Sequence, residues 1–398
     1  MKYVNGDVYF KSGNKEVYPY LNYDIKTDVA IIGGGFSGLI TAYFLSESEK
    51  NVTVFEKNII GYGLSFGIKG LIKIDYMNLV YKKKKEEITR LYELYLSSKE
   101  KLKKILEETN TKYFELDRYM YVNKMMQKNN LQKNIDFMDS VFNVKGEIIE
   151  NIYEVNSTLL AKFDDKVISF NSNQFINNLA KYLVEKRNVE IYENTNIIDV
   201  EPTYEKVFLI TNNDFKVEAS KVIYASGMDI LKTVNVNITT FEKFNILLDK
   251  NEELKGKKKY LENFNEEGQN IVFKESGCLD ISGEDIKVNM KMMDLRYKES
   301  LEKEKYAKMV VWVNKLVDKG EYKNRGRCYS SIYGKTFDML PIIDEIECMP
   351  NCFVVASFGT NTILNAVIAG GILKNAVNGL FTKEIRFFKL NREGCINK

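Results

Sequence analysis

One glycine-rich stretch near the N-terminus constrains the fold of this chain more than any other feature. It opens with an apolar run at 29–32, continues through Gly33, Gly35 and Gly38 in G-x-G-x-x-G spacing, and ends at Glu56. An apolar run without a polar face is typical of a strand buried on both sides in a parallel sheet. The glycines permit a tight turn, close approach of the backbone to a pyrophosphate, and close packing of a helix on the strand. The stretch therefore predicts a dinucleotide-binding βαβ unit.

The acid at the end of this unit narrows the choice of nucleotide. A second strand is expected at 52–55, and Glu56 follows it, 18 residues after the third glycine. A carboxylate there accepts hydrogen bonds from a ribose 2′-OH and disfavours a 2′-phosphate, so FAD or NAD is favoured over NADP. The N–H groups at the start of the intervening helix would bind the pyrophosphate. The alternative is a structural turn without a ligand, and the agreement of strand, helix and acid argues against it.

The residue counts exclude several classes of protein. The chain has no histidine, so Ser-His-Asp and Cys-His catalysis, histidine-ligated metals and Rieske clusters are impossible. Its 58 basic and 55 acidic residues nearly cancel, which gives no electrostatic reason to expect nucleic acid or an anionic membrane as a partner. The five cysteines form no C-x-x-C pair, so we expect reduced thiols in a cytoplasmic protein and no metal site. We expect neither a signal peptide nor a membrane span, because the least polar long segment, 353–373, contains glycines and polar residues.

Two further segments fit FAD better than a single mononucleotide. The segment Gly61–Gly70 contains four glycines, and an extended FAD needs backbone close to its ribityl chain and flavin ring. Near the C-terminus, a strand at 353–356, a turn at Ser357–Asn361 and a following helix repeat the geometry of the opening motif. A second helix N-terminus would stabilise the negative charge of a reduced flavin. The alternative for this segment is one more packed βα unit.

The chain is long for one compact core, so two domains are expected. We assign 1–76, 150–238 and 334–398 to an FAD-binding domain, and 77–149 and 239–333 to a substrate domain. The predicted fold class is α/β plus α+β, in which a Rossmann-like FAD-binding domain is interleaved with a mostly antiparallel-sheet substrate domain.

Hydrophobic periodicity predicts the main elements of both domains. We expect helices at 77–108, 131–142, 171–182 and 301–317. The third helix has Asn171 or Ser172 as its expected N-cap. We expect strands at 113–122, 189–192, 207–210, 221–227, 278–282, 285–292 and 353–356, the fourth of which ends in a turn of small residues.

With these residues in view, the chain resembles the D-amino acid oxidase (DAO) superfamily of FAD-dependent oxidoreductases from Tyr18 onward. It is most similar to the gamma-glutamylputrescine-oxidase-like branch. The shared motifs are Tyr18-Pro-Tyr-Leu, the glycine fingerprint with Glu56, Gly61-x-Gly63-x-Ser65, Ala225-Ser226-Gly227, Thr336-Phe-Asp-x-x-Pro341-Ile-Ile and Phe358-Gly359-Thr360-Asn361. The resemblance implies a glutathione-reductase/DAO-type fold with FAD extended in one domain. It also implies oxidation of a C–N bond of an amino acid or amine, or of a related C–O bond.

The resemblance further implies a set of cofactor-binding residues, each taken from a matching motif. The expected FAD-binding residues are Gly33, Gly35, Phe36, Ser37, Gly38, Glu56, Lys57, Gly63, Leu64, Ser65, Ile197, Ala225, Ser226, Gly227, Gly359, Thr360, Asn361, Thr362 and Ile363. The flavin is expected to be non-covalent, because Ser331 stands where sarcosine-oxidase-like members carry the attaching cysteine.

Two residues are implied as catalytic candidates. Lys287 lies on a segment similar to the strand on which sarcosine-oxidase-like members place a lysine near the flavin for oxygen activation. The alternative for Lys287 is a strand lysine that faces solvent. Tyr333 stands where the family often has a carboxylate-binding arginine, and it can donate one hydrogen bond but cannot form a bidentate ion pair. Arg325 and Arg327 lie nearby in the sequence and could replace that arginine.

Three hypotheses for function follow. The first is an FAD-dependent oxidoreductase that oxidises a small-molecule amino acid or amine by hydride transfer to flavin N5. The second is an FAD-binding protein of the same fold that has lost amine oxidation and acts as a binding or regulatory module. It is motivated by Tyr333 and by Thr362, which replaces a glycine of the family. The third is an NAD-dependent enzyme, which leaves the loop at 61–70 without a purpose.

Overall fold

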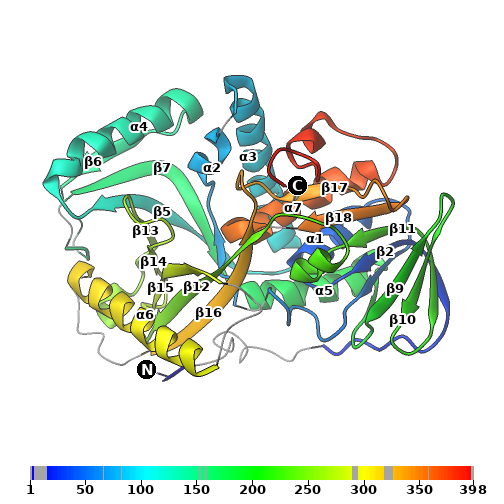
Figure 1. Cartoon of the computed structure of the whole chain (residues 1–398). Helices are drawn as coiled ribbons and strands as arrows, with labels where there is room; N and C mark the ends of the chain where they lie inside the picture. The colour runs from blue at the N-terminus through cyan, green and yellow to red at the C-terminus, as the bar shows by residue number, and fades with distance from the viewer. Residues whose placement is uncertain are drawn as a thin grey trace. The chain divides into compact units, whose positions relative to one another are not determined.

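The computed structural model describes residues 2–3, 16–65, 67–81, 83–150, 152, 154–156, 159–288, 295–317, 326–356 and 358–395. These residues form two compact units (Figure 1). Unit 1 lies within Met1–Lys11, Tyr113–Phe170 and Thr240–Ile332, and unit 2 lies within Ser12–Lys112, Asn171–Thr239 and Tyr333–Lys398.

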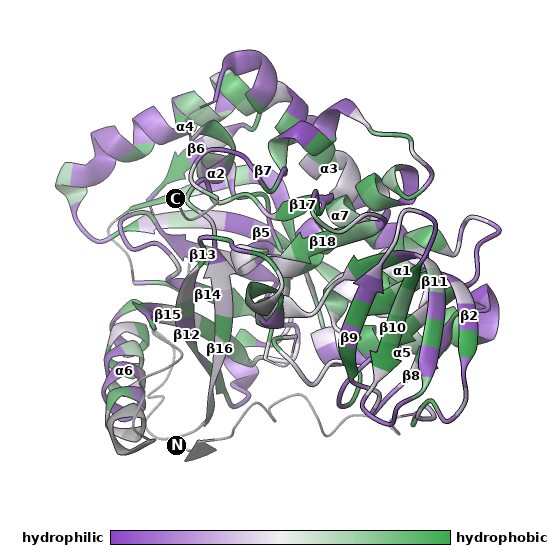
Figure 2. Ribbon diagram, turned by 45° about the vertical axis from the view of Figure 1, so that its right-hand side comes forward, coloured by the Kyte–Doolittle hydropathy of each residue, from purple (hydrophilic) through white to green (hydrophobic). Residues whose placement is uncertain are grey.

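Unit 2 is built on a mainly parallel sheet. Its strand order is β17 (Ile342–Glu345), β18 (Cys352–Ala356), β11 (Lys216–Tyr224), β2 (Ile25–Ile32), β3 (Val52–Phe55) and β8 (Glu190–Tyr192). Neighbours from β18 to β8 are parallel, and β17 is antiparallel to β18. The strands β9 (Ile197–Pro202) and β10 (Val207–Thr211) continue antiparallel from β11. Figure 2 colours β17, β18 and α1 largely as hydrophobic, as expected for elements buried inside an α/β layer.

The helices of unit 2 pack closely where small residues meet, and one of them begins at a side-chain N-cap. α1 (Phe36–Leu45) contacts α7 (Thr362–Ala376), and a Cβ on Gly370 would lie only 2.3 Å from the Phe44 ring. α5 (Ser172–Arg187) begins at the predicted N-cap, because the Asn171 side chain accepts a hydrogen bond from Gln174 N at 3.0 Å. The remaining elements of unit 2 are β4 (Gly70–Ile72), α2 (Tyr76–Val80), α3 (Lys85–Glu108) and the short 3₁₀ helices η2 (Gly227–Lys232), η4 (Gly359–Asn361) and η5 (Lys383–Phe387).

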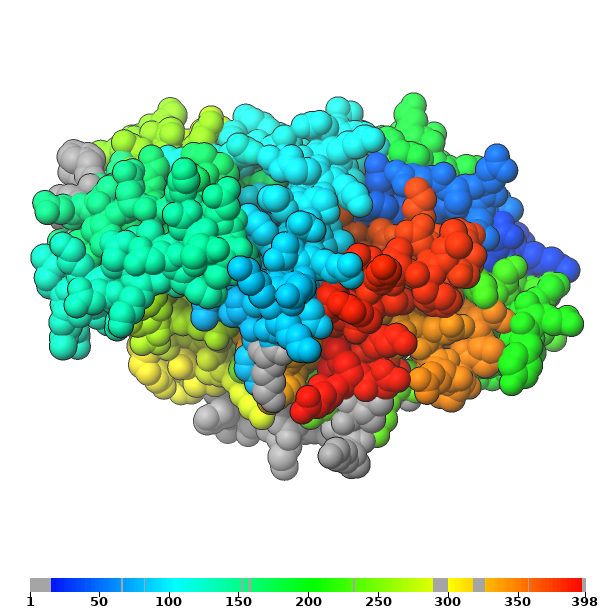
Figure 3. Space-filling view, turned by 90° about the horizontal axis from the view of Figure 1, so that it is seen from above, coloured from blue at the N-terminus to red at the C-terminus, as the bar shows by residue number. Residues whose placement is uncertain are grey.

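The C-terminal segment of unit 2 covers the edge strand β17. Ile343 N donates to Phe388 O at 2.9 Å, and Leu390 N donates to an Asp344 carboxylate oxygen at 2.9 Å. In Figure 3 the C-terminal residues, in red, lie at the surface beside orange residues of this region. Pairing of an edge strand protects it from association with other chains.

Unit 1 is built on a mostly antiparallel sheet. Its order is β1 (Lys2–Tyr3), β16 (Gly326–Lys335), β12 (Thr239–Leu248), β15 (Leu279–Lys287), β14 (Asn270–Phe273), β13 (Lys259–Asn263), β5 (Tyr113–Val122) and β7 (Leu159–Phe170), with β6 (Gly146–Ile149) beside β7. The β13–β5 and β1–β16 pairs are parallel. α4 (Lys128–Phe142) packs on β6 and β7, and two short 3₁₀ helices, η1 (Met125–Gln127) and η3 (Glu252–Leu254), lie in loops.

One face of the unit 1 sheet is apolar and carries the long helix α6 (Leu295–Leu316). The core formed there includes Phe244, Ile246, Leu261, Ile271, Ile281, Tyr306, Met309 and Val313. Tyr306 meets Phe244 edge to face, with ring centroids 5.5 Å apart. Alternate residues of these strands must therefore point to the other face, which α6 does not cover.

The architecture confirms the predicted fold class, and several elements have the predicted bounds. Two expectations were wrong in detail. The single helix expected at 77–108 is split into α2 and α3, because Tyr81 leaves the helical conformation with a ψ of 116°. The two strands expected at 278–282 and 285–292 form one bulged strand, β15, in which Glu284 has a φ of +55°. Residues 289–292 lie outside the described part of the chain.

The compact units differ from the domain boundaries proposed from the sequence at several elements, of which α3 and β7 are the longest. α3 lies in unit 2, where Tyr95 donates to Asn365 of α7 at 2.7 Å, although the sequence places it in the substrate domain. β7 lies in unit 1, where it pairs with β5, although the sequence places it in the FAD-binding domain. The domain division itself stays a proposal. None of the helices in the described ranges is long and apolar enough to cross a membrane.

Candidate functional site

The first glycine of the fingerprint is held against another predicted cofactor segment. Gly33 follows β2 with a φ of +115°, and a Cβ there would lie 2.5 Å from Ala225 O. A Cβ on Gly38 would lie 1.9 Å from Gly33 O. Both positions therefore require glycine, because the atoms that would clash belong to the backbone and cannot rotate away.

The N-terminus of α1 has the features of an anion site. Its N-cap, Gly35, provides no side-chain cap, and the first turn of Phe36, Ser37 and Gly38 contains no acid. Phe36 N donates to Ser65 Oγ at 3.0 Å, so the second glycine loop reaches the helix end. No acidic residue of α1 itself therefore lies in the first turn at its positive end.

Glu56 is buried and holds the glycine turn as well as ending β3. One carboxylate oxygen accepts from Gly34 N at 2.8 Å and the other accepts from Asn58 N at 2.9 Å. A carboxylate oxygen has more than one acceptor position, so these bonds leave capacity for a ribose hydroxyl. The neighbouring Lys57 forms an ion pair with Asp229 at 2.5 Å, on the exposed side of unit 2.

The second glycine loop approaches the segment after β11. Leu64 lies against Gly227, whose φ is +62° and whose Cβ would lie 3.2 Å from the leucine side chain. A Cβ on Gly63 would meet nothing within 4 Å, which leaves open space beside the backbone. Ile197, on β9, packs against the core of unit 2. The segments around Gly33, Ser65 and Gly227, far apart in sequence, thus converge in one unit.

The C-terminal turn lines a pocket in unit 2. The pocket contains about 350 Å³ of space, part of it open to solvent, and is lined by Asp75, Asn78, Leu79, Tyr95, Lys335, Met339, Phe358, Gly359, Thr360, Asn361 and Asn365. Gly359, Thr360 and Asn361 were predicted cofactor residues. Thr362 and Ile363 begin α7, and Thr362 Oγ1 donates to Gly359 O at 3.0 Å. Ser357 lies outside the described residues.

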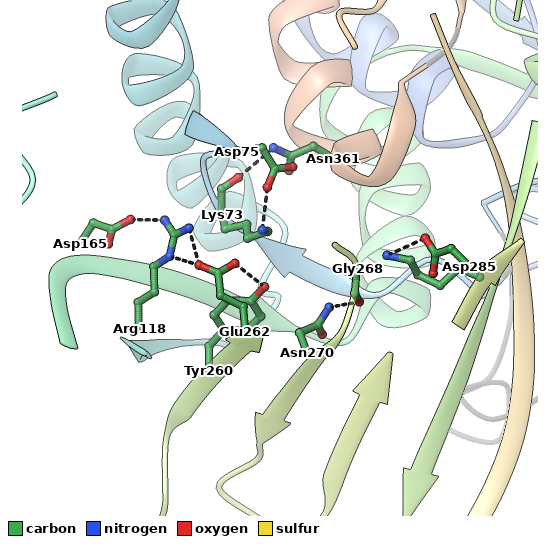
Figure 4. A network of polar contacts seen from close by, with 11 residues as sticks. Lys73, Asp75, Arg118, Asp165, Tyr260, Glu262, Gly268, Asn270, Asp285 and Asn361 are labelled. Atoms are coloured by element: carbon green, nitrogen blue, oxygen red, sulfur yellow. Dashed lines mark hydrogen bonds and ion pairs between the residues drawn. The ribbon is translucent and has the colours of Figure 1, made fainter. Parts of the chain in front are cut away.

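Polar contacts shape the wall of this pocket. Asn361 donates to Lys73 O at 2.8 Å, and Lys73 Nζ lies 2.7 Å from an Asp75 carboxylate oxygen (Figure 4). Asn365 accepts from Tyr95 OH and donates to Phe358 O, each at 2.7 Å. Burial raises the pKa of Tyr95, which keeps its hydroxyl a neutral donor.

Most of the residues that line this pocket were not among the predicted site residues, and three of them, Tyr95, Asp75 and Asn365, show why. Tyr95 belongs to an apolar stripe at helical spacing, which favoured a core role without a ligand. Asp75 and Asn365 stand in no motif, and only the contact of α3 with α7 brings Asn365 to Tyr95. No signal in the sequence identifies them.

The predicted catalytic residues lie in different settings. Lys287 is exposed at the end of β15, in unit 1. Tyr333 is buried in unit 2, with Lys335 Nζ 5.7 Å from its ring centroid. Of the two arginines proposed to replace it in carboxylate binding, Arg327 is exposed and Arg325 lies outside the described residues.

The Thr336-x-Asp338 motif forms a structural turn. Arg392 Nε and Nη2 contact the two Asp338 oxygens at 2.9 and 3.0 Å, and Thr336 Oγ1 donates to Leu340 O at 2.6 Å. Burial opposes the charge of Asp338, but the hydrogen bonds and charge of Arg392 outweigh it and lower the pKa of the carboxyl. Asp338 therefore anchors the C-terminal segment.

The residues of unit 2 fit an extended dinucleotide. Glycines without room for a Cβ bring three backbone segments together, a helix whose N-cap is a glycine adjoins them, and a buried carboxylate follows β3. Such a site is made mainly of backbone N–H groups, which suits the pyrophosphate. The fit supports a cofactor of the FAD type.

Comparisons with known proteins agree with this fit. A sequence model of the family described as "FAD dependent oxidoreductase" (DAO) matches residues 28–376. No curated protein sequence matches the chain.

Solved structures share the fold at low sequence identity. A glycine oxidase from Geobacillus kaustophilus has a TM-score of 0.76 at 17% identity, covering 92% of this chain and 99% of its own. An L-proline dehydrogenase from P. horikoshii has a TM-score of 0.73 at 16% identity, covering 93% and 98%. An L-alpha-glycerophosphate oxidase from Mycoplasma pneumoniae with FAD bound has a TM-score of 0.72 at 16% identity, covering 90% and 96%. With a family match over most of its length, the chain belongs to the DAO family of FAD-dependent oxidoreductases, and its cofactor is FAD.

Proposed function

We propose that this enzyme oxidises a C–N bond of an amino acid or amine, with FAD bound non-covalently in unit 2. The observation that carries the proposal is the convergence of the segments around Gly33, Ser65 and Gly227, together with the polar pocket at Gly359–Asn361. FAD, when bound, accepts the electrons of the substrate C–H bond. The chain itself has to bind, orient and exclude water, which needs no histidine.

The names of the compared structures support an amine substrate over others. Two of the three are named for amino acids, and the third for a phosphorylated alcohol. The pocket in unit 2 has both a carboxylate, Asp75, and a cation, Lys335, at its wall, which suits a small polar ligand. We also propose, from the sequence motifs alone, that the chain lies near the gamma-glutamylputrescine-oxidase-like branch.

Two side chains are proposed to act on the reaction. Tyr333 is proposed to donate a hydrogen bond to the substrate, because a tyrosine hydroxyl can donate one such bond and the side chain is buried. Lys287 is proposed to aid the reaction of reduced flavin with oxygen. Its exposure equally suits a lysine that only faces solvent, so the variant below decides between the two.

Anaerobic mixing with a panel of amino acids and amines tests the main function. We expect at least one compound to bleach the oxidised flavin absorbance of the purified holoenzyme. If no compound does so, the competing function, a flavin-binding module that has lost oxidation, is favoured.

A lysine variant tests the oxygen step separately. Lys287→Met should slow reoxidation of the reduced flavin and leave its reduction by substrate unchanged. Lys303→Met is the matched control, because Lys303 is an exposed lysine on α6 of the same unit. Equal reoxidation rates in both variants would remove Lys287 from the reaction.

A further inference from the structure

Strand register places a line of polar side chains on the face of the unit 1 sheet that α6 does not cover. Glu262 of β13 pairs with Asn270 of β14, Asn270 pairs with Ser282 of β15, and Ser282 pairs with Asn245 of β12. Directly opposed residues share a face of a sheet. We call these four residues the polar row.

The residues adjacent to the polar row along each strand belong to the apolar core under α6. Leu261, Ile271, Ile281 and Ile246 follow or precede members of the row and are fully buried in that core. Because successive side chains alternate between faces, the row must lie on the opposite face. All four members are nonetheless at most 8% exposed. Buried polar groups are normally hydrogen-bonded, so each residue of the row is expected to have a hydrogen-bond partner.

Two members of the row satisfy each other. Ser282 Oγ donates to Asn245 Oδ1 at 2.7 Å, and Asn245 Nδ2 lies 3.4 Å from Ser331 Oγ. This end of the row is therefore a closed network.

Asn270 has an unused acceptor. Its Nδ2 donates to Gly268 O at 2.9 Å, and since a carbonyl oxygen only accepts, this bond fixes which end of the amide is nitrogen (Figure 4). Its Oδ1 is buried and makes no hydrogen bond within the described structure. A buried acceptor without a donor is unfavourable unless a ligand supplies one.

The charged neighbours favour a cationic ligand over an anionic one. Glu262, next to Asn270, brings a buried carboxylate, and Tyr260 OH donates to one of its oxygens at 3.2 Å. Arg118 is a buried cation of this face, and two carboxylates already bind it: Glu262 through Nε and Nη2 at 2.8 and 2.6 Å, and Asp165 through Nη1 at 2.9 Å. The guanidinium of Arg118 is therefore already bound by protein carboxylates. Lys243 of β12 is likewise paired, because its Nζ lies 3.5 Å from an Asp285 carboxylate oxygen. A carboxylate ligand would meet hydrogen-bond acceptors here, the oxygens of Glu262 and Asn270, instead of donors.

We propose that Asn270, beside Glu262 in the polar row, binds an N–H donor of the ligand, so that unit 1 recognises an organic ammonium group. The inference deepens the proposed function, on which it rests, by specifying the chemistry of the substrate. It assigns Asn270 Oδ1 as the acceptor and Glu262 as the compensating charge.

Isothermal titration of the holoenzyme with butylammonium chloride tests this assignment, with sodium butyrate and butan-1-ol as probes of equal chain length. Butylamine is protonated at neutral pH, as a lysine side chain is. We expect butylammonium to bind more tightly than the other two. Asn270→Leu should weaken its binding about tenfold, the effect of losing one hydrogen bond to a charged group.

Asn263→Leu is the matched control. Asn263 lies on β13 next to Glu262 and is equally buried, but both ends of its amide are paired, with Gln269 and with Asn265 N. It should keep the affinity of the wild type. If Asn270→Leu does not fold, Asn270→Val, which suits a strand and has no hydrogen-bond acceptor, should show the same loss.

The proposal is overturned if butylammonium does not bind, if butyrate binds at least as tightly, or if Asn270 and Asn263 variants lose affinity equally. Because binding is measured without turnover, the two proposals fail separately. Binding that depends on Asn270 with no flavin reduction by any amine rejects only the proposed function. Flavin reduction by an amine with no dependence of binding on Asn270 rejects only this inference.

Discussion

The cofactor segments of unit 2 and the polar row of unit 1 are built in opposite ways. In unit 2, Gly33 and Gly38 let backbone segments approach so closely that a Cβ at either position would clash with a backbone oxygen. In unit 1, side chains of four separate strands meet because of strand register. A backbone site tolerates changes of nearby side chains, whereas a side-chain site depends on each partner. The comparison predicts that the two respond differently to substitution.

The largest effect is expected from Gly38→Ala. The added Cβ would lie 1.9 Å from Gly33 O, so the turn between β2 and α1 has to move. We expect loss of bound FAD after gel filtration and a fall in the free energy of unfolding of about 1–3 kcal/mol or more. Gly371→Ala in α7 is the control, because a Cβ there meets nothing within 4 Å. It should retain FAD and gain about 0.5–1 kcal/mol; equal FAD contents in the two variants would refute the backbone description.

Arg118→Met should destabilise the polar row of unit 1 and leave the glycine turns of unit 2 unchanged. It leaves the buried Glu262 carboxylate without its guanidinium, a change that costs about 3–5 kcal/mol in comparable buried pairs. Urea denaturation should show this loss, while the variant that remains folded keeps FAD. A loss under about 1 kcal/mol would mean that water already solvates the pair.

The Asp338 carboxylate is a charge of unit 2 whose role is structural, because it binds Arg392 of the C-terminal segment. Its pKa is lowered, so its ion pair contributes stability above the unfolded pKa of about 4, and this contribution disappears as the pH falls through the folded pKa. Asp338→Asn should lower the free energy of unfolding at pH 7 by about 1–3 kcal/mol. Urea denaturation across acidic pH should show a shallower decline in the variant than in the wild type. Parallel declines would show that Arg392 does not hold the carboxylate.

The smallest effect is expected from Thr362→Ala. Thr362 replaces a family glycine, but its hydroxyl makes only one partly exposed hydrogen bond, to Gly359 O. We expect a loss of about 0.5–1 kcal/mol in thermal unfolding and unchanged FAD content. A large loss of FAD would instead show that the Thr362 hydroxyl, and not only its backbone, holds the cofactor.

The segments that converge around Gly33 in unit 2 could be picked out from the sequence, whereas the polar row of unit 1 could not, for a physical reason. A glycine that admits no Cβ, such as Gly33, leaves a local pattern, and its neighbours Ala225 and Gly227 stand in motifs of their own. Asn270 lies on a strand of four residues without any motif, and its position depends on pairing with β13 and β15.

Residues of the unit 2 pocket show the same limit. Tyr95 fits the apolar stripe of a helix, and the periodicity that predicted the helix could not reveal its hydrogen bond to Asn365, which is 270 positions away. Asp75 stands in no motif, and its place in the pocket wall follows from its position between β4 and α2 in the folded chain. The spacing of apolar residues predicts helices and strands. Contacts between residues far apart in the sequence decide which side chains meet.

The most direct test of C–N oxidation by this enzyme is anaerobic flavin reduction by matched pairs that differ only in the oxidised group: alanine against lactate, and butylamine against butan-1-ol. We expect that at least one nitrogen compound reduces the flavin and that its oxygen counterpart does not. Reduction by lactate or butan-1-ol, with none by alanine or butylamine, would contradict the assignment of this enzyme to C–N oxidation.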